Sequence, residues 1–106
     1  MTSKKVVTTR MADDDIRDAV AYLRRSAGRD VTARLIDALE STVSHIGDFP
    51  AIGSSRFAVE TRIAELRDVA LHRFPYVVFY TDDVDAVRIH RVLHSSQDIP
   101  SVFARP

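Results

Sequence analysis

Residues 66–94 read LRDVALHRFPYVVFYTDDVDAVRIHRVLH, and this stretch decides the fold. It contains three runs rich in β-branched and aromatic residues, separated by a Phe-Pro pair and by an acidic turn, at residues 66–73, 76–81 and 86–94. Such residues favour extended strands, and short turns join strands that run antiparallel. The stretch therefore predicts a three-stranded antiparallel meander.

The residues before this meander predict a fourth strand and two helices. Residues 5–10, KVVTTR, are short and β-branched, which indicates a strand. Two apolar stripes then recur with the period of a helix, at Ile16, Ala19, Val20, Leu23 and Ala27 and at Leu35, Ile36, Leu39, Val43 and Ile46. We expect Gly28 to end the first helix, Asp30 to cap the second, and Gly47 to close it.

A connection of about three residues between the two stripes predicts a helical hairpin. The order of elements is then β-α-α-β-β-β. This is an α+β fold in which the hairpin packs on a mainly antiparallel four-stranded sheet, and we expect one domain over residues 1–106.

The expected strand pairing gives the sheet two different faces. Pairing Thr81 with Ala86 sets Val78 opposite Ile89, and a tight turn at Phe74 sets Val69 opposite Val78. The face predicted to pack on the helices is apolar, with arginines toward its ends, and comprises Arg67, Val69, Leu71, Tyr76, Val78, Tyr80, Val87, Ile89, Arg91 and Leu93. The other face is predicted to be an exposed, mixed patch that something covers, and it comprises Asp68, Ala70, His72, Val77, Phe79, Arg88, His90, Val92 and His94. Its composition is typical of a binding surface.

Composition and charge exclude several classes of protein. The chain has no cysteine and therefore no disulfide framework or Cys-based zinc site. His90 and His94 lie about 13 Å apart along one strand, too far for one ion, and no cofactor motif occurs, so neither a metal nor a cofactor is expected. No signal peptide or membrane span is predicted, and the cytoplasm is the expected location. Fifteen cations balance fifteen acids, which argues against strong direct binding to nucleic acid.

Catalysis is one alternative for the polar sheet face. His72, His90 and His94, with Arg88 and Asp68, would supply acid-base groups for cleaving a phosphodiester, although no lysine or tyrosine partner is evident. In the alternative interpretation these residues are solvated sheet positions. Residues 95–98 contain two serines, but no base and carboxylate are spaced around them as a triad needs, which favours a plain loop.

Several strings distributed along the chain resemble the ParE branch of the RelE/ParE toxins of bacterial toxin–antitoxin modules. They are ADDDI at 12–16 followed by Tyr22-Leu23, FPAIG at 49–53, Leu66-Arg67, FPYVVFY at 74–80, and VRIHRVLHSSQDIP at 87–100. The resemblance implies a small cytoplasmic toxin that a cognate antitoxin holds inactive. ParE members poison DNA gyrase, whereas RelE members cut messenger RNA on the ribosome.

The resemblance favours the gyrase branch, because the cations that RelE members use for cleavage are missing. The corresponding strand positions hold Asp68, Ala70 and Val77, and the final turn offers Ser96 and Gln97. His94 remains where some ribosome-dependent members keep a catalytic histidine, so the endoribonuclease stays an alternative. An inert homologue that only binds antitoxin is another.

The resemblance and the strand pairing together assign candidate site residues. The residues predicted to contact the target are Arg67, Arg91, His94, Ser95, Ser96, Gln97 and Asp98, and those predicted to contact the antitoxin are Val77, Phe79, Arg88 and Val92. In a structural alternative, Arg67 and Arg91 tie the sheet to helix acids by ion pairs.

Overall fold

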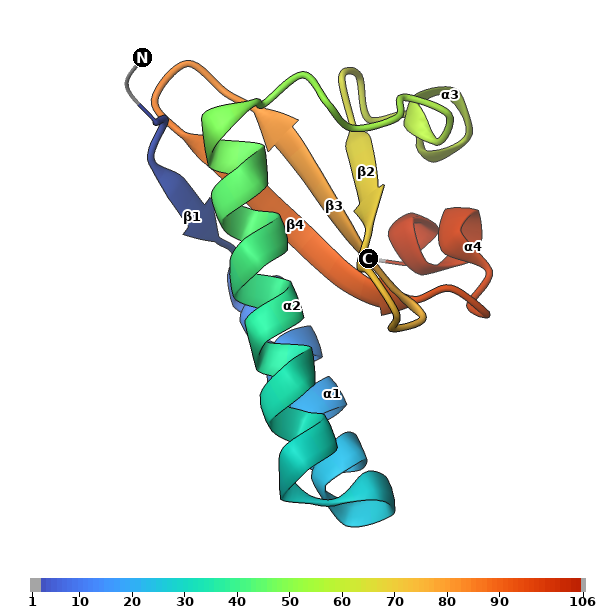
Figure 1. Cartoon of the computed structure of the whole chain (residues 1–106). Coiled ribbons are helices and arrows are strands. Elements are labelled where there is room, and N and C mark those ends of the chain that lie inside the picture. Colours follow the sequence, from blue (N-terminus) through green and yellow to red (C-terminus); the bar gives the residue numbers. More distant parts are fainter. Residues whose placement is uncertain (1–2, 106) are drawn as a thin grey trace.

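The computed structural model describes residues 3–105, which form two long helices, a four-stranded sheet and two short helices (Figure 1). The elements in chain order are β1 (Val6–Thr8), α1 (Arg10–Ala27), α2 (Arg29–Asp48), α3 (Ala58–Thr61), β2 (Arg67–Ala70), β3 (Tyr76–Asp82), β4 (Val87–His94) and α4 (Ile99–Ala104). The strand order is β1-β4-β3-β2, with β1 parallel to β4 and the other pairs antiparallel. The predicted α+β class is confirmed.

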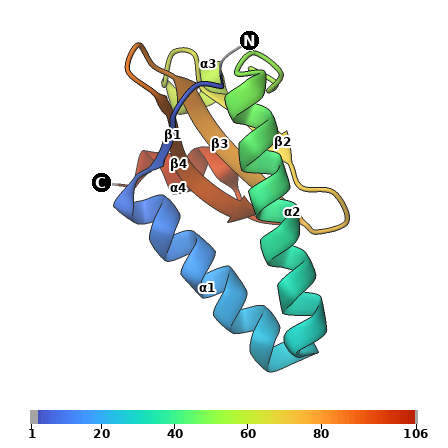
Figure 2. The same cartoon turned by 60° about the vertical axis from the view of Figure 1, so that its left-hand side comes forward.

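The helical hairpin packs on one face of the sheet and extends beyond the sheet at its far end (Figures 1 and 2). The core between the hairpin and the sheet comprises Ala12, Ala19, Leu35, Leu39, Ile46, Leu71, Val78, Tyr80, Val87, Ile89 and Val92. Within residues 3–105, no helix combines the length and the apolar composition needed to cross a lipid bilayer.

The long helices begin earlier than expected. Thr9 caps α1, because its hydroxyl oxygen accepts a hydrogen bond from the Ala12 amide at 3.1 Å, so the helix starts at Arg10. Gly28, with φ of 89°, is the whole connection, and α2 starts at Arg29; the prediction that Asp30 caps α2 is wrong. Gly47 lies inside α2, where a Cβ would come within 3.0 Å of the Val6 side chain. Its role is therefore close packing of α2 on β1.

Between β2 and β3 the predicted pairing is confirmed, with Val69 opposite Val78. Between β3 and β4 it is wrong. Val78 lies opposite Val92 instead of Ile89, and Tyr80 lies opposite Ile89. One reason is the turn between β3 and β4, which begins later than expected because β3 continues through Asp82.

The second reason is a β-bulge. Phe79 pairs with Arg91 and Tyr80 with Ile89, which leaves His90 as an extra residue on β4. Beyond the bulge the alternation of faces is inverted. Val92 therefore lies in the helix-side core and Leu93 on the opposite face, the reverse of the prediction.

The prediction that this opposite face is exposed is also wrong, because the chain covers it itself. Val77 is 6% exposed and Phe79 is fully buried. Their cover is α4, an unpredicted helix in a region expected to contain only strands and loops, together with residues around α3. This second core comprises Leu66, Val77, Phe79, Leu93, Ile99 and Val102, with Phe57, Ala58, Ile63 and Phe103 packed against it.

Candidate functional site

A cleft of about 360 Å³ lies between α1 and the end of β4. It brings together three of the predicted target-contact residues, Arg91, His94 and Gln97. The other lining residues come from α1, from β4 and from the start of β3, and they are Asp15, Asp18, Ala19, Tyr22, Tyr76, Val92 and Leu93.

An ion pair joins the two elements that flank the cleft. Arg91 donates through Nε to Asp15 Oδ2 at 2.7 Å and through its terminal nitrogen to Asp15 Oδ1 at 2.9 Å. The Val92 amide donates to the same carboxylate at 3.0 Å. The side chains of Arg91 and Asp15 are only 16% and 14% exposed. The hydrogen bonds with Asp15 raise the pKa of Arg91 despite its burial.

This bidentate pair is the geometry in which arginine binds a carboxylate most strongly. It agrees with the structural alternative for Arg91, in which the arginine ties the sheet to a helix acid. The guanidinium is therefore occupied and is not a free cation in the cleft.

His94 organises the turn that follows β4. Its Nδ1 accepts a hydrogen bond from the Ser96 amide at 3.1 Å and lies 2.7 Å from Ser96 Oγ. Since an amide can only donate, Nδ1 carries no proton in this arrangement, and the proton of the neutral ring is on Nε2. The His94 amide also donates to Gln97 Oε1 at 3.0 Å.

Two tyrosines form the aromatic part of the cleft. The ring of Tyr76 meets that of His94 edge to face, with centroids 5.3 Å apart. Burial, and to a lesser extent the nearby Tyr22, raise the pKa of Tyr76. Tyr22 itself is 58% exposed.

The remaining predicted target residues do not line this cleft. Arg67 lines a separate hollow and donates to the carbonyl oxygens of Ala51 at 3.1 Å and Gly53 at 2.8 Å. It ties a loop to β2 through backbone groups, and its hydrogen bonds do not involve a helix acid. Ser95 and Ser96 are exposed in the turn, and Asp98 precedes α4, where it accepts a hydrogen bond from Ser101.

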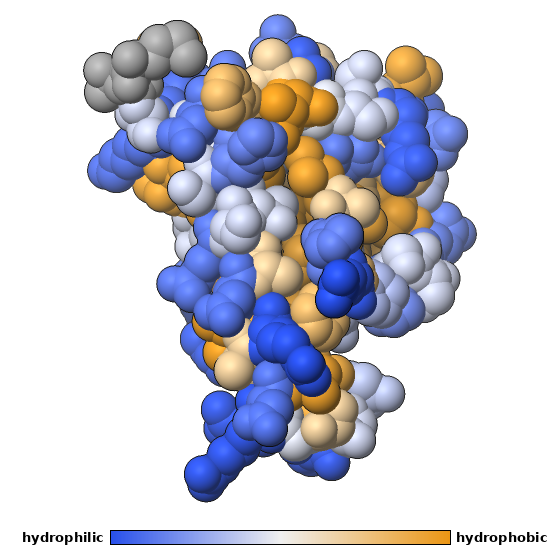
Figure 3. Space-filling model, in the orientation of Figure 1, coloured by the Kyte–Doolittle hydropathy of each residue, from blue (hydrophilic) through white to orange (hydrophobic). Residues whose placement is uncertain are grey.

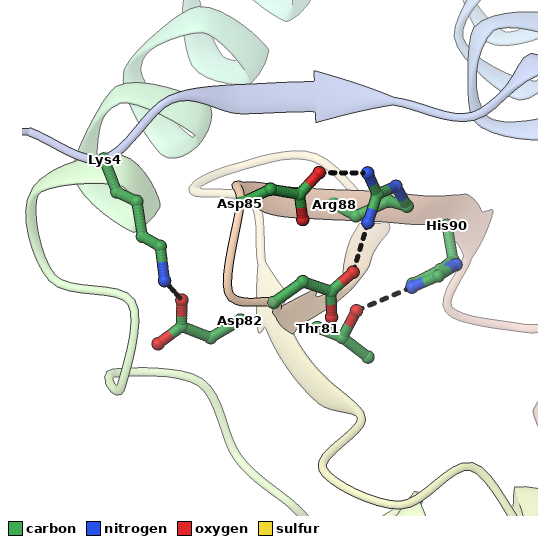
Figure 4. A network of polar contacts seen from close by, with 7 residues as sticks. Lys4, Thr81, Asp82, Asp85, Arg88 and His90 are labelled. Carbon is green, nitrogen blue, oxygen red and sulfur yellow. Dashed lines mark hydrogen bonds and ion pairs between the residues drawn. The ribbon is translucent and has the colours of Figure 1, made fainter.

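The predicted antitoxin residues are mostly inaccessible. Val77, Phe79 and Val92 are all buried, so the exposure on which that assignment rested is absent. Arg88 is half-buried, and it pairs with Asp83 and with Asp85 (Figure 4).

The same view shows a polar neighbourhood that is satisfied within the chain. Thr81 Oγ1 lies 2.8 Å from Nε2 of His90, and Lys4 pairs with Asp82 at 2.6 Å (Figure 4). Burial lowers the pKa of His90. Within residues 3–105, no three His, Cys, Asp or Glu side chains are grouped to hold a metal ion.

The sequence-based predictions missed Asp15, Asp18, Tyr22 and Tyr76 as cleft residues. Asp15, Asp18 and Tyr22 follow the i, i+3, i+7 spacing that places side chains on one side of a helix, so this half of the cleft had a readable signal. No such signal marks Tyr76 in the sequence, because its alternation with Val78 predicts only a core position.

The sequence model of a family described as the ParE toxin of the type II toxin–antitoxin system, parDE, matches residues 6–99. The chain belongs to the ParE toxin family. Among solved structures, the toxin is similar to a chain of the chromosomal ParDE TA system from P. aeruginosa, with 15% identity and a TM-score of 0.72. That similarity covers 87% of the toxin and 96% of the other chain, and it supports the fold. No relative among curated protein sequences matches.

Proposed function

We propose that this toxin poisons DNA gyrase by binding and trapping it, without bond-breaking chemistry of its own. The chain belongs to the ParE family, and its resemblance to the ParE branch, which implies a gyrase-directed toxin, supports this target. The observation that carries the proposal is the bidentate pair between Arg91 and Asp15. It removes from the cleft the cation that cleavage of a phosphodiester would need.

The alternative endoribonuclease needs a base, an acid and a cation around the scissile phosphate. A phosphate would have to displace Asp15 from Arg91, which would leave a poorly exposed carboxylate unpaired at a cost of about 3 kcal/mol or more. His94 is held at Nδ1 by Ser96 and packed against Tyr76. The cleft therefore fits a role in contact better than a role in proton transfer.

The proposed contact surface is the rim of the cleft. His94, Ser95, Ser96, Gln97 and Asp98 form one exposed or half-exposed turn, and Asp18 and Tyr22 face it from α1. Arg91, paired with Asp15, lines the same cleft from β4. Exposed tyrosines are enriched at protein interfaces because they bury much area at little entropic cost. Arg67 lines a separate hollow and is an independent candidate.

Neutralisation by a cognate antitoxin is the second part of the proposal, and it needs a surface other than the predicted one. A groove of about 640 Å³ runs between α2 and the β2–β3 turn. It is lined by the apolar side chains Val31, Ala38 and Phe74 and by three charged ones, Arg34, Asp37 and Arg73. The two arginines have no ion-pair partner among residues 3–105 and outnumber the single acid. An antitoxin segment with apolar anchors and acidic flanks would complement this groove.

Purified toxin, gyrase and relaxed plasmid test the target. We expect loss of supercoiling or accumulation of cleaved complexes in proportion to toxin. Tyr22→Ala should weaken inhibition about tenfold or more, because interface tyrosines commonly contribute ~2 kcal/mol. Val84→Ala is the matched control, since Val84 is fully exposed at the distant β3–β4 turn. Undiminished supercoiling at saturating wild-type toxin would overturn the gyrase proposal.

His94→Gln separates the two chemistries. Glutamine keeps hydrogen bonding but cannot exchange a proton near neutral pH, so a gyrase poison should keep most of its toxicity. An endoribonuclease should lose roughly 10²–10⁴-fold of its cleavage. The measurement is growth arrest at equal folded yield, together with mapped transcript ends on translating ribosomes. Cuts with wild type that vanish in the variant would assign the toxin to the nuclease branch, and absence of arrest with wild type would favour the inert homologue.

A further inference from the structure

The tip of the helical hairpin is the most basic segment of the chain. Residues 24–29 read RRSAGR, three arginines in six residues without an acid, although the chain as a whole has no formal net charge. By contrast, residues 13–18 at the other end of α1 contain four aspartates. Opposite charges are thus separated along the hairpin, and the positive end is the tip.

The structure leaves this tip open. Arg24, Arg25 and Arg29 are exposed and form no ion pair or side-chain hydrogen bond among residues 3–105. A Cβ added at Gly28 would meet nothing within 4 Å. The tip projects away from the sheet, and strongly hydrophilic residues gather at this lower end of the molecule (Figures 1 and 3).

Helix stability explains only part of this cluster. Arg24 and Arg25 lie in the last turn of α1, where cations interact favourably with the helix dipole. Arg29 is the first residue of α2, where a cation faces the positive end of the dipole and is unfavourable. Asp30 is the next residue, and its negative charge only partly offsets this unfavourable interaction. An arginine at a position that the helix dipole disfavours indicates a role in binding and not in stability of the fold.

Two of the arginines share a hollow. Arg24 and Arg29 line a depression of about 400 Å³ together with Thr32 and Ile36. The one-residue connection at Gly28 brings the end of α1 and the start of α2 together there. A planar guanidinium group can donate two parallel hydrogen bonds to the oxygens of one phosphate. Two arginines around one depression are therefore suited to binding a phosphodiester.

We infer that the hairpin tip binds the phosphate backbone of duplex DNA. Three cations give a weak interaction, in accord with the balanced charge of the chain. A dissociation constant near 10⁻⁴ M at physiological salt is the weak end of nonspecific binding to DNA. Such a contact gains importance when the toxin is already held beside DNA. The claim that this DNA is the segment bound by gyrase rests on the proposed function, whereas the claim that the tip binds DNA does not.

The effect on gyrase follows from effective concentration. A tethered contact meets its partner at roughly millimolar concentration, so a 10⁻⁴ M interaction strengthens the complex on DNA about tenfold. Toxin binding to gyrase without DNA should be unaffected by the tip.

Fluorescence anisotropy with a labelled 30-base-pair DNA duplex tests the tip directly. Wild-type toxin should bind with a slope of log affinity against log salt of about −2.7, which is a fall of about 40-fold between 50 and 200 mM salt. The triple variant Arg24→Gln, Arg25→Gln, Arg29→Gln should have a slope near zero. The control variant Arg10→Gln, Arg62→Gln, Arg105→Gln removes the same charge from other exposed positions and should bind like wild type.

Equal slopes for the tip and control variants, or no binding by wild type at 20 mM salt, would overturn the inference. A second arm measures gyrase inhibition on plasmid DNA, where the tip variant should need about tenfold more toxin and the control variant should not. Full inhibition by the tip variant would overturn the assignment to gyrase-bound DNA. If wild-type toxin leaves gyrase active, the proposed function fails, and the duplex measurement still decides whether the tip binds DNA.

Discussion

Asp15 is the residue on which the geometry of the cleft depends most. Its carboxylate accepts two hydrogen bonds from Arg91 and one from the Val92 amide, so a single side chain fixes α1 against the free edge of β4. Beyond the pairing of Thr8 with Ile89, β1 ends, and no other strand of residues 3–105 pairs with β4 on that side. Asp15 therefore supplies a hydrogen-bond acceptor for the Val92 amide, as the backbone of a further strand would do there.

Replacing Asp15 with Asn tests this role. The variant leaves the poorly exposed Arg91 without a charged partner, and we expect the free energy of unfolding to fall by about 3 kcal/mol. The double variant Asp15→Leu, Arg91→Met should lose much less, because it removes both charges together. Urea denaturation of the three proteins measures the difference. Stability of Asp15→Asn within about 0.5 kcal/mol of wild type, as for an ordinary surface change, would contradict the assignment.

His90 predicts a pH dependence of stability. Burial, supported by Arg88 and opposed by Asp83, lowers the pKa of this imidazole in the folded state. The unfolded chain, with an ordinary pKa of about 6.5, therefore takes up a proton at a higher pH than the folded chain does. Stability from this group is present above that value and is lost as the pH falls toward the folded-state pKa.

The measurement is the free energy of unfolding between about pH 8 and pH 5. His90→Gln should flatten the decrease below about pH 6.5, since glutamine does not titrate and can still bond to Thr81. The control is His72→Gln, which replaces an exposed histidine. An identical pH profile for His90→Gln and wild type would show that burial of His90 does not couple to folding.

At the scale of elements, the meander and the hairpin were predictable because their signals are long and regular. The bulge in β4 was missed because it carries no glycine or proline. Its trace in the sequence is a change of phase, in which apolar residues alternate at Val87 and Ile89 and then stand side by side at Val92 and Leu93. An adjacent apolar pair in a strand with two covered faces is compatible with a simple buried strand as well, so the pattern alone does not reveal the register.

The short helix α4 escaped prediction for a different reason. Its six residues, IPSVFA, span fewer than two turns, which is too short for a helical period to be read. Without α4, the mixed face of the sheet had no cover within the chain, and an external partner was the natural inference. The choice of Val77 and Phe79 as antitoxin contacts rested on this missed element, whereas the choice of Val92 rested on the missed bulge.

Ending the chain after Asp98 tests the importance of α4. The truncation removes Ile99 and Val102 and exposes Phe79 and its neighbours. Buried aliphatic side chains each contribute about 1.5–3 kcal/mol, so the loss approaches the whole stability of a small domain. We expect a lowered melting temperature, or loss of the cooperative transition, and binding of a hydrophobic dye. Ser101→Ala, which removes only a surface hydrogen bond to Asp98, is the control. A truncated protein that melts like wild type would show that α4 is dispensable.

At the scale of the molecule, the described residues have a radius of gyration of 13.5 Å, and both faces of the sheet are covered from within. The candidate surfaces for partners among the described residues therefore lie at the edges of the layers, and they include the cleft beside β4, the groove beside α2 and the tip of the hairpin. These three surfaces differ in charge and location. The proposed contacts with target, antitoxin and DNA would thus use different parts of the surface.

Antitoxin binding should raise the stability of the whole toxin. A partner that binds only the folded state stabilises it by mass action, by ~2.7 kcal/mol at a hundredfold excess over the dissociation constant. For a domain of about 100 residues, this corresponds to a rise in melting temperature of roughly 10–20 °C.

If the groove beside α2 is the docking surface, Arg34→Glu with Arg73→Glu should shrink that rise, because acidic flanks of the antitoxin would then meet like charges. Arg10→Glu with Arg62→Glu makes the same change of charge elsewhere and should keep it. A melting temperature that saturating antitoxin leaves unchanged would exclude neutralisation by binding to the folded toxin, and an undiminished rise in the groove variant would place the antitoxin on another surface.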